Sequence, residues 1–369
     1  MSLTIAQKQR LLTDIQTKGV RLLSTAQDCV SRRGGAGPSD HQAMVIDDTT
    51  VMVPVHTQAV IESPFSLSSA SSGKVSLRNN NIPITDITFA NEPKFYNLTT
   101  DDGIAYSKIA TLHGVDVLAT TVLQTCIRYE NRKRSCQFCS IGQSLAAGRT
   151  IARKTPQQLA EVAKAAVELD GVKHMVMTTG TPATTDRGAK ILCESVEAVK
   201  AVVDIPIQVQ CEPPANSVWY QRLKEAGADA LGLHLEVVTP SVREYIMPSK
   251  AKITLEDYMQ AFKDSVPVFG WGQVSTYILA GLGDSAQAIL KVCEQLITLG
   301  VYPFVVPFVP IRGTPLEDHP APSSAFMEEI LVPLGEKVTQ ANLRSTDIKA
   351  GCGRCGACSS MSTYETYHW

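Results

Sequence analysis

Hydrophobic positions in the middle of the chain alternate between the spacing of a β-strand and that of an α-helix. Short apolar segments predict strands near residues 115–125, 174–178, 205–211, 230–237, 273–280 and 302–309. Helical spacing between them predicts helices near residues 154–169, 189–203, 217–226, 255–265 and 285–299. Strands that alternate with helices pair in parallel through right-handed crossovers. We therefore predict an α/β fold built on a six-stranded parallel partial (β/α)6 barrel.

The segments on either side of this pattern do not show the alternation. The first begins with an amphipathic helical pattern, continues through a Gly-, Pro- and Ser-rich link at 31–41, and then alternates like edge strands. We predict an N-terminal α+β extension over residues 1–112 that covers one mouth of the barrel. The barrel itself is expected over 113–320, with a C-terminal extension over 321–369.

Composition narrows the class of protein. Lys plus Arg is 34 and Asp plus Glu is 36, so no overall field favours nucleic acid as a partner. No apolar run approaches the ~18 residues that cross a bilayer, and the N-terminus lacks a signal-peptide pattern. Ten cysteines without a secretory signal favour reduced thiols and metal or cluster binding over disulfides. We predict a cytoplasmic protein with no membrane partner.

Three cysteines share a short basic loop, TCIRYENRKRSCQFC, directly after the first predicted strand. Cys126, Cys136 and Cys139 have the spacing C-x9-C-x2-C. Three thiolates can hold three irons of a cubane cluster and leave the fourth iron open to a small molecule. Ligands of parallel α/β folds bind beyond the carboxyl ends of the strands, where this loop lies. We predict that the loop is the reaction centre, with structural zinc as the alternative.

Polar residues and glycines also follow the other predicted strands. They are Thr179-Gly180-Thr181, Cys211-Glu212, His234 with Glu236, Gly281-Leu282-Gly283-Asp284, and Pro310-Ile311-Arg312-Gly313-Thr314. Glu236 lies in an apolar strand, where a carboxylate without a partner is costly, which favours a functional role. His234 is either a satisfied core histidine or a site residue.

The order of the strands and of the motifs that follow them resembles the radical S-adenosylmethionine (radical SAM) superfamily, and within it the biotin synthase and lipoyl synthase group. The resemblance spans roughly residues 115–318. The resemblance implies a SAM-binding 4Fe–4S cluster on Cys126, Cys136 and Cys139, with S-adenosylmethionine on the open iron. An aromatic residue precedes the last cysteine in the family, and Phe138 fills that place. One electron cleaves S-adenosylmethionine to methionine and a 5′-deoxyadenosyl radical, which abstracts hydrogen from substrate. A donor such as flavodoxin or ferredoxin supplies that electron.

Three further motifs carry the resemblance. The segment HLEVV resembles the strand that contacts the ribose, which implies that Glu236 accepts from a hydroxyl. GLGD resembles the family's GLGE, which implies close approach of adenosine to Gly281 and Gly283. TTGT stands at the glycine motif that binds the methionine amino group, so Thr179, Gly180 and Thr181 are its degraded match.

Some features depart from the group's pattern. The longer spacing between the first two cysteines also occurs in Elongator-type tRNA-modifying proteins. Cys211 aligns with a ligand of biotin synthase's 2Fe–2S cluster, but Ser275 stands where another ligand would fall, which argues against biotin synthase itself. The chain also resembles the biotin synthase-related radical SAM proteins encoded beside nitrilases in bacteria.

A second cysteine group follows near the C-terminus in AGCGRCGACSSMS. Cys352, Cys355 and Cys358 have the spacing C-x2-C-x2-C, and Ser362 stands where a ferredoxin run has its fourth cysteine. Lipoyl synthases resemble it in placing a serine on an auxiliary cluster. We predict an auxiliary 4Fe–4S cluster whose fourth iron takes Ser362, substrate or water. Zinc, with His368 or another cysteine as fourth ligand, is the alternative.

Three functions compete. The first is a radical SAM enzyme acting on a small organic or acyl substrate, by sulfur insertion or by desaturation or rearrangement of an amino-acid-derived metabolite. The second is a radical SAM tRNA-modifying enzyme, which the near-neutral charge opposes. The third is a zinc-stabilised, non-catalytic protein. Two sets of basic residues have no fixed role: Arg128, Arg132, Lys133 and Arg134 suit a solvated face, cluster-charge compensation or donor docking, and Arg149 and Arg312 suit carboxylate clamps.

Overall fold

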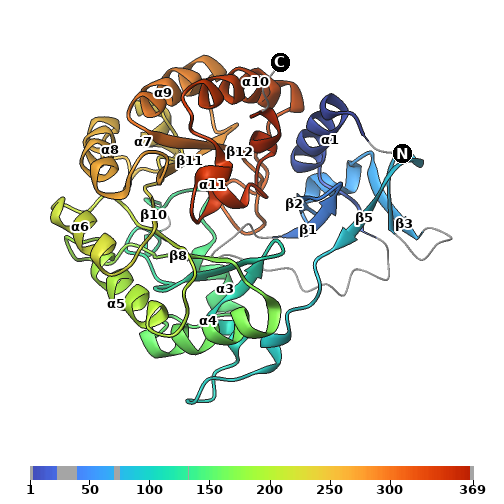
Figure 1. Cartoon of the computed structure of the whole chain (residues 1–369). Helices are drawn as coiled ribbons and strands as arrows, with labels where there is room; N and C mark the ends of the chain where they lie inside the picture. Colours follow the sequence, from blue (N-terminus) through green and yellow to red (C-terminus); the bar gives the residue numbers. More distant parts are fainter. Residues whose placement is uncertain (1–2, 23–39, 70–74, 132, 366–369) are drawn as a thin grey trace.

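A computed structural model describes residues 3–22, 40–69, 75–131 and 133–365 of the chain. In these residues the strands form two sheets, one of seven strands in the order β12-β11-β10-β9-β8-β7-β6 and one of five in the order β2-β1-β5-β4-β3. Figure 1 shows the larger sheet enclosed by a ring of helices, with the smaller sheet and α1 to one side.

The larger sheet is curled and mostly parallel, which matches the predicted α/β fold. Its strands are β6 (Thr111–His113), β7 (Val117–Thr121), β8 (His174–Thr178), β9 (Ile207–Gln210), β10 (Ala230–Gly232), β11 (Val274–Ala280) and β12 (Val301–Pro307). Strands β7 to β12 pair in parallel in chain order. The expected number of six strands needs correction, because β6 adds an antiparallel seventh on the edge of β7. A three-residue strand is too short to show an alternating pattern.

The fourth predicted strand is also shorter than expected. The apolar segment runs to residue 237, but β10 ends at Gly232. The buried Arg243 side chain donates to the carbonyls of Leu235 (2.8 Å) and Val237 (2.7 Å), which takes these acceptors out of a regular ladder. The segment rejoins the sheet only at an isolated bridge from Glu236 to Ile278. The side chain of Arg243, a few residues later in the sequence, therefore determines the backbone path of this segment.

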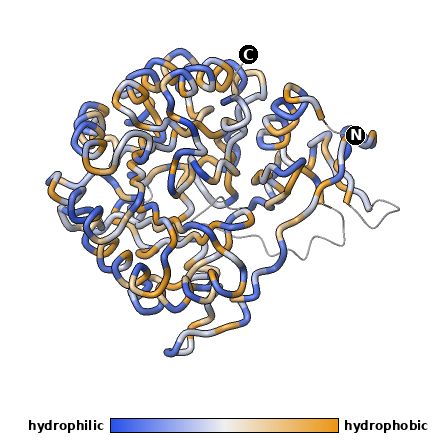
Figure 2. The backbone as a smooth tube through the Cα atoms, viewed as in Figure 1, coloured by the Kyte–Doolittle hydropathy of each residue, from blue (hydrophilic) through white to orange (hydrophobic). Residues whose placement is uncertain are grey.

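Helices pack along the outside of the larger sheet. They are α4 (Pro156–Asp170), α5 (Ala189–Lys200), α6 (Val218–Glu225), α7 (Pro240–Ile246), α8 (Leu255–Phe269), α9 (Ala286–Thr298) and α10 (Ser324–Gln340). The predicted capping box at Thr155 and Gln158 is formed, and Leu159, Val162 and Ala163 of α4 are fully buried. Figure 2 shows hydrophobic and hydrophilic residues alternating along these helices, as expected for one buried face. Within the described ranges, no helix is long and apolar enough to cross a membrane.

The N-terminal segment forms its own antiparallel sheet and core. It contains α1 (Ile5–Lys18), β1 (His41–Ile46), β2 (Thr49–Pro54), η2 (Gln58–Glu62), β3 (Phe65–Ser69), β4 (Val75–Asn79) and β5 (Ile82–Phe89). Leu12 and Ile15 of α1 pack in this core with Met44 and Phe65. η3 (Lys94–Asn97) and α2 (Tyr106–Ile109) lead to the barrel. The proposed boundary at residue 112 falls inside β6, so the domain division stays a prediction. The predicted link at 31–41 lies mostly outside the described residues.

The C-terminal segment enters the barrel from the amino-terminal end of the strands. It contains η4 (Ser345–Asp347), α11 (Cys352–Cys355) and η5 (Ser360–Tyr364). The Gly351 N–H donates to His174 Nδ1 (3.3 Å) at the start of β8, and the Lys349 N–H donates to Gln273 Oε1 (3.0 Å) just before β11. Figure 1 shows α11 inside the ring of helices. We call residues 345–365 the tail.

Candidate functional site

The loop that follows β7 brings the three predicted cysteines together. The Cys139 N–H donates to the Cys136 carbonyl (3.0 Å), which closes a tight turn between these two residues. Cys126 and Cys136 are both near enough for their charges to act on the Cys139 thiol. α3 (Ile141–Ala146) begins directly after the loop. The cysteines lie at the carboxyl end of β7, where the sequence places them.

The chemistry of these thiols fits iron. Burial raises the pKa of the Cys139 thiol to about 11, and burial with the nearby Glu236 carboxylate raises the pKa of Cys136 well above its usual value. Metal binding deprotonates such thiols outright, because it supplies the missing positive charge. Within the described part of the chain, no three His, Cys, Asp or Glu side chains are grouped closely enough to hold one metal ion. A cubane instead spreads its thiolates over separate irons.

An ion pair inside the barrel mouth anchors the cysteine loop. Arg128 donates from Nε to Glu212 Oε1 (2.5 Å) and from Nη2 to Glu212 Oε2 (2.6 Å), which is a bidentate contact. Its Nη1 donates to the Ser249 carbonyl (2.5 Å). Burial opposes the charge of Glu212, but the Arg128 hydrogen bonds hold its pKa below the usual value. Arg128 therefore points inward, whereas Lys133 and Arg134 are exposed and Arg132 lies outside the described residues.

The TTGT motif after β8 packs against the same loop. A Cβ on Gly180 would lie only 2.1 Å from the Thr125 carbonyl oxygen, so the two backbones are in direct contact. The Ile127 N–H donates to the Thr181 carbonyl (3.0 Å), and the Thr181 side chain hydrogen bonds to Glu212. The Thr179 N–H donates to the Gln210 carbonyl (3.2 Å). The motif is thus part of the wall around the cysteines.

Glu236 has a partner that the sequence did not reveal. Its Oε2 forms an ion pair with Lys250 Nζ (2.5 Å), and Lys250 Nζ also donates to the His234 carbonyl (3.0 Å). Burial alone opposes the charge of Lys250, but the Glu236 carboxylate raises its pKa above the usual value. Glu236 has a positive φ of 61°, a conformation that costs on the order of 1–3 kcal/mol and is concentrated at functional sites.

Glycines and one aromatic residue complete this end of the barrel. Gly281 (φ 107°) has Pro322 against it, where a Cβ would lie 2.9 Å from the proline ring. Gly283 has a φ of 116°. The Asp284 carboxylate, which follows them, accepts from the N–H groups of Val238 (2.8 Å) and Thr239 (2.9 Å), so its role is structural. Phe138 packs against an apolar cluster that includes Val237, Ile246, Met247, Leu282, Phe308 and Leu316.

His234 lies between the two ends of the barrel interior. Burial, with the nearby Lys250 charge, lowers the pKa of His234 to about 3, so the imidazole is neutral. Its ring centroid is 5.5 Å from that of Tyr277 on β11. Its Nδ1 is buried and has no hydrogen-bond partner in the structure as described. Of the two readings from sequence, a satisfied core histidine does not describe this residue.

The tail cysteines form a second group inside the barrel, against side chains of β6, β9 and β11. Cys352 Sγ accepts from Gln210 Nε2 (3.3 Å), Cys358 Sγ lies 3.6 Å from His113 Nε2, and the Tyr277 hydroxyl hydrogen bonds to Cys358. Burial raises the pKa of Cys355 to about 12. Iron bound here would deprotonate these thiols and offset the charge of the resulting thiolates. Sequence reasoning missed His113, Gln210 and Tyr277, because none belongs to a motif.

The remaining predicted residues have ordinary surroundings. Ser362 lies in η5, with its Oγ 3.2 Å from the place a Cβ on Gly356 would take. Ser275 accepts from Gln208 Nε2 (3.0 Å). Burial raises the pKa of Cys193 to about 11 and that of Cys211 to about 12. Cys293 is buried, and the buried Nη1 of Arg149 has no hydrogen-bond partner among the described residues. The Arg312 carbonyl accepts from Gln143. Cys29 and His368 lie outside the described residues.

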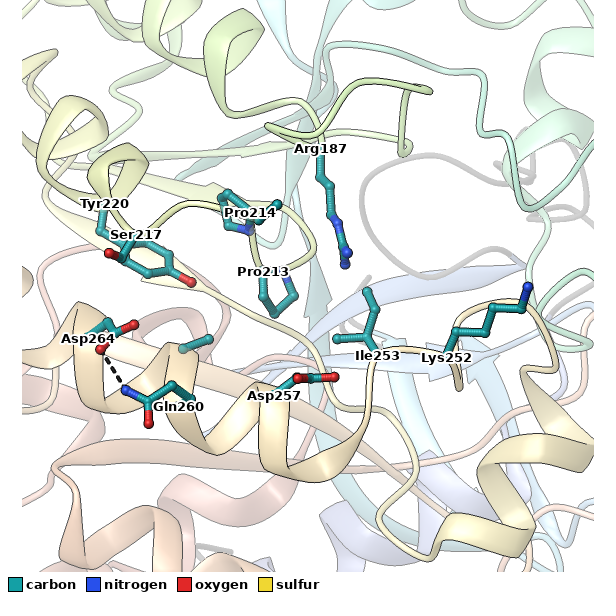
Figure 3. A pocket seen from close by; sticks show the side chains of 12 residues that line it. Arg187, Pro213, Pro214, Ser217, Tyr220, Lys252, Ile253, Asp257, Gln260 and Asp264 are labelled. Atoms are coloured by element: carbon teal, nitrogen blue, oxygen red, sulfur yellow. Dashed lines mark hydrogen bonds between the residues drawn. The ribbon is translucent and has the colours of Figure 1, made fainter.

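A polar cavity of about 350 Å³ lies near the cysteine loop, between the segment after β9 and helix α8. Figure 3 shows Arg187 extending toward Ile253 and Asp257 across it. Arg187 Nη1 is 3.7 Å from Glu212 Oε2, so the cavity adjoins the anchor of the cysteine loop. None of its lining residues is among the predicted site residues.

Comparisons with known proteins find a family model and a curated relative that match the barrel. The sequence model of the radical SAM superfamily matches residues 131–296, a range that contains Cys136, Cys139 and strands β8 to β11. A curated relative, bacteriochlorophyllide c C-7(1)-hydroxylase of Chlorobaculum limnaeum, is 27% identical over 237 residues, 59% of this chain and 58% of that protein. The chain therefore spans less than two thirds of that relative's length.

Solved structures resemble the chain more distantly. Methylornithine synthase (PylB) has a TM-score of 0.49 and 18% identity and covers 67% of this chain and 70% of its own. HydG, a maturase of the [FeFe]-hydrogenase, has a TM-score of 0.48 and 15% identity, and the match covers 63% of this chain and 51% of HydG. Both TM-scores are below 0.5, so neither structure supports an argument about this chain.

The matched domain indicates a class for this part of the chain. Residues 131–296 match the radical SAM superfamily, whose members use a 4Fe–4S cluster and S-adenosylmethionine. This match favours the first two of the three competing functions over the zinc-stabilised, non-catalytic protein. The comparisons do not extend to the biotin synthase and lipoyl synthase group, which stays a prediction.

Proposed function

We propose that this radical SAM enzyme acts on a small organic or acyl substrate held inside the barrel, between the cysteine loop and the tail. Cys126, Cys136 and Cys139 would hold the SAM-binding 4Fe–4S cluster. That cluster supplies the electron that cleaves S-adenosylmethionine and so generates the radical that abstracts hydrogen. Cys352, Cys355 and Cys358 would hold an auxiliary 4Fe–4S cluster, whose fourth iron the sequence leaves to Ser362, substrate or water.

One observation carries the proposal, a chain of contacts that joins the two cysteine groups through the barrel. Tyr277 hydrogen bonds to the tail thiol of Cys358, and its ring lies 5.5 Å from the His234 ring. The His234 carbonyl accepts from Lys250, which pairs with Glu236. The charges of Lys250 and Glu236 in turn act on the radical-site thiols. Because both cysteine groups face the same barrel interior, we infer that they serve one reaction chamber.

The polar residues of the chamber have separate tasks in this proposal. Glu236, held by Lys250, would accept from a ribose hydroxyl of S-adenosylmethionine. The unpartnered Nδ1 of the neutral His234 would hydrogen bond to a polar group of the substrate, because a buried donor or acceptor without a partner is costly. The exposed Lys133 and Arg134 would meet an acidic electron donor such as flavodoxin or ferredoxin.

The backbone around the cysteine loop would complete the S-adenosylmethionine site. Thr179, Gly180 and Thr181 would face the methionine end, since they form the wall against the cysteine loop. Gly281 and Gly283 would let the backbone approach adenosine, because glycine has no side chain and tolerates the positive φ found at both positions.

Several outcomes of hydrogen abstraction fit this chamber. Sulfur insertion would draw sulfide from the auxiliary cluster, whereas desaturation or rearrangement would leave the cluster intact. The relative's name includes a hydroxylase, which supports functionalisation of an unactivated carbon as the general reaction class. A tRNA substrate is the alternative, and the near balance of 34 basic and 36 acidic residues opposes it. A gel-shift assay with tRNA separates these two substrate classes.

Metal content after anaerobic reconstitution tests the proposal. Wild type should bind about eight irons and eight sulfides per chain, and a Cys352→Ala/Cys355→Ala/Cys358→Ala variant about four of each. Cys193→Ala, which removes a half-buried thiol outside both groups, is the control and should match wild type. About four irons in both proteins, with zinc lost from the triple variant, would make the tail a structural zinc site.

Cleavage of S-adenosylmethionine without substrate tests the radical site separately. With a chemical reductant, Cys136→Ala should form no 5′-deoxyadenosine, because the cluster loses a ligand. Cys355→Ala should keep this uncoupled cleavage and lose product once a substrate is known. A Cys136→Ala variant that still makes 5′-deoxyadenosine would refute the assignment of the cysteine loop as the reaction centre.

A further inference from the structure

We propose that His113 is the fourth protein ligand of the metal centre held by Cys352, Cys355 and Cys358. The proposal rests on the auxiliary centre proposed above and names a ligand in place of Ser362. His113 is the last residue of β6, and the turn that follows it leads to β7. It is separated from Cys358 by 245 residues, so no local motif links them.

The turn after β6 covers two of the three thiols. His113 Nε2 lies 3.6 Å from Cys358 Sγ. At Gly114, the next residue, a Cβ would lie 4.0 Å from Cys355 Sγ. An imidazole nitrogen is an established iron ligand and replaces cysteine on one iron of Rieske clusters. The structure thus places a metal-binding atom next to the three-cysteine group.

The other polar neighbours of the tail thiols are not ligands of this kind. Gln210 approaches Cys352 with its amide nitrogen Nε2 (3.3 Å), which has donor hydrogens and no lone pair for iron. The Tyr277 hydroxyl makes a hydrogen bond to Cys358. Both contacts resemble the hydrogen bonds to sulfur that tune a cluster's potential. Ser362 Oγ lies against Gly356, 3.2 Å from the place a Cβ would take there.

A histidine at this position has a consequence for the reaction. Four protein ligands leave no open iron for substrate, so the centre would act on the substrate without binding it. Histidine in place of cysteine raises a cluster's reduction potential. Both effects favour desaturation among the proposed outcomes. The 5′-deoxyadenosyl radical would take one hydrogen atom from the substrate, and a proton would leave the adjacent carbon. The auxiliary cluster would accept the remaining electron as the C=C bond forms.

Pulsed electron paramagnetic resonance on a full-length variant tests the ligand. Cys126→Ala/Cys136→Ala/Cys139→Ala removes the radical site, so every cluster signal comes from the tail. This variant should take up about four irons per chain. With ¹⁵N-histidine in otherwise ¹⁴N protein, the reduced cluster should show a directly bonded ¹⁵N coupling. Adding His113→Ala should abolish the coupling, and His113→Cys should abolish it while keeping the iron.

His174→Gln is the matched control, because His174 also contacts the tail through Gly351. It should leave the coupling unchanged. A four-iron cluster without a bonded histidine nitrogen would overturn the assignment of His113 and leave the auxiliary cluster standing. Failure to bind iron in the radical-site variant would instead overturn the auxiliary cluster. Zinc in its place, lost with His113→Ala, would also refute the cluster but support His113 as a ligand.

Discussion

Replacing Gly180 by alanine should disable the radical site while leaving most of the protein folded. The new Cβ would lie 2.1 Å from the Thr125 carbonyl oxygen and 2.9 Å from its carbonyl carbon, and contacts below 3.0 Å force a shift. Both atoms belong to backbone, so no side-chain rotation relieves the clash. The cysteine loop has to move by about 1 Å, and Cys126 is the next residue along it.

The expected sizes of the two effects differ. Overpacking costs about 1–3 kcal/mol of folding free energy, which a protein of this size tolerates. A displacement of about 1 Å at a reacting centre costs on the order of 100-fold in rate. We therefore expect Gly180→Ala to lower the rate of uncoupled S-adenosylmethionine cleavage by about two orders of magnitude, with a modest loss of thermal stability.

Gly335→Ala provides the matched control. It creates a similar clash, 2.3 Å from the Tyr364 carbonyl oxygen, in helix α10. Thermal melts of both apoproteins should show comparable losses, and only Gly180→Ala should lose cleavage activity after reconstitution. If both variants cleave S-adenosylmethionine at similar rates, the contact between the TTGT motif and the cysteine loop does not position the radical site.

Three further outcomes follow from buried charges and can be measured by unfolding and kinetics. Glu212→Gln should destabilise the apoprotein by about 3–5 kcal/mol because Arg128 stays buried without its charge partner. The pKa of Glu212 is lowered by folding, so wild type should lose this advantage over the variant as pH falls below 4.5; a pH-independent difference would contradict the ion pair. Relative to wild type, His234→Gln should become more stable as pH falls from 6.5 toward 3, by at most about 1.4 kcal/mol of unfolding free energy per pH unit. The reason is that folded wild type must keep a neutral imidazole in this range. Parallel stability profiles of the two proteins would contradict burial of that ring. Lys250→Met should raise KM for S-adenosylmethionine more than it lowers kcat, because Glu236 loses the cation that orients it, and an unchanged KM would remove Glu236 from the binding site.

The barrel could be predicted because its pattern is local. Each of β7 to β12 is a short apolar segment, and caps such as Thr155 mark the helices between them. β6 escaped detection because three residues carry no periodicity. The end of β10 was misplaced because the Arg243 side chain, not the apolar pattern, decides where its carbonyl groups bond.

The site was predictable only in its motifs. Cysteine spacing pointed to both thiol groups, and their assignment as cluster ligands stays a prediction. The partners of those groups come from distant parts of the chain and have no motif. Arg128 read as one charge in a basic loop, but it pairs with Glu212, 84 residues later. Lys250 follows α7 in an ordinary polar turn, and only the folded barrel places it against Glu236.

The contacts between α1 and the tail set an order for biogenesis. Gln16 Nε2 donates to the Ala357 carbonyl (3.1 Å), and Thr13 Oγ1 lies 2.8 Å from Ser360 Oγ. Helix α1 therefore leaves the ribosome long before its partners in the tail are synthesised. A nascent chain has complete strands around the radical-site loop well before the tail emerges. Iron delivery during translation would thus reach the two thiol groups in sequence, and removal of α1 would spare the first group and disturb the second.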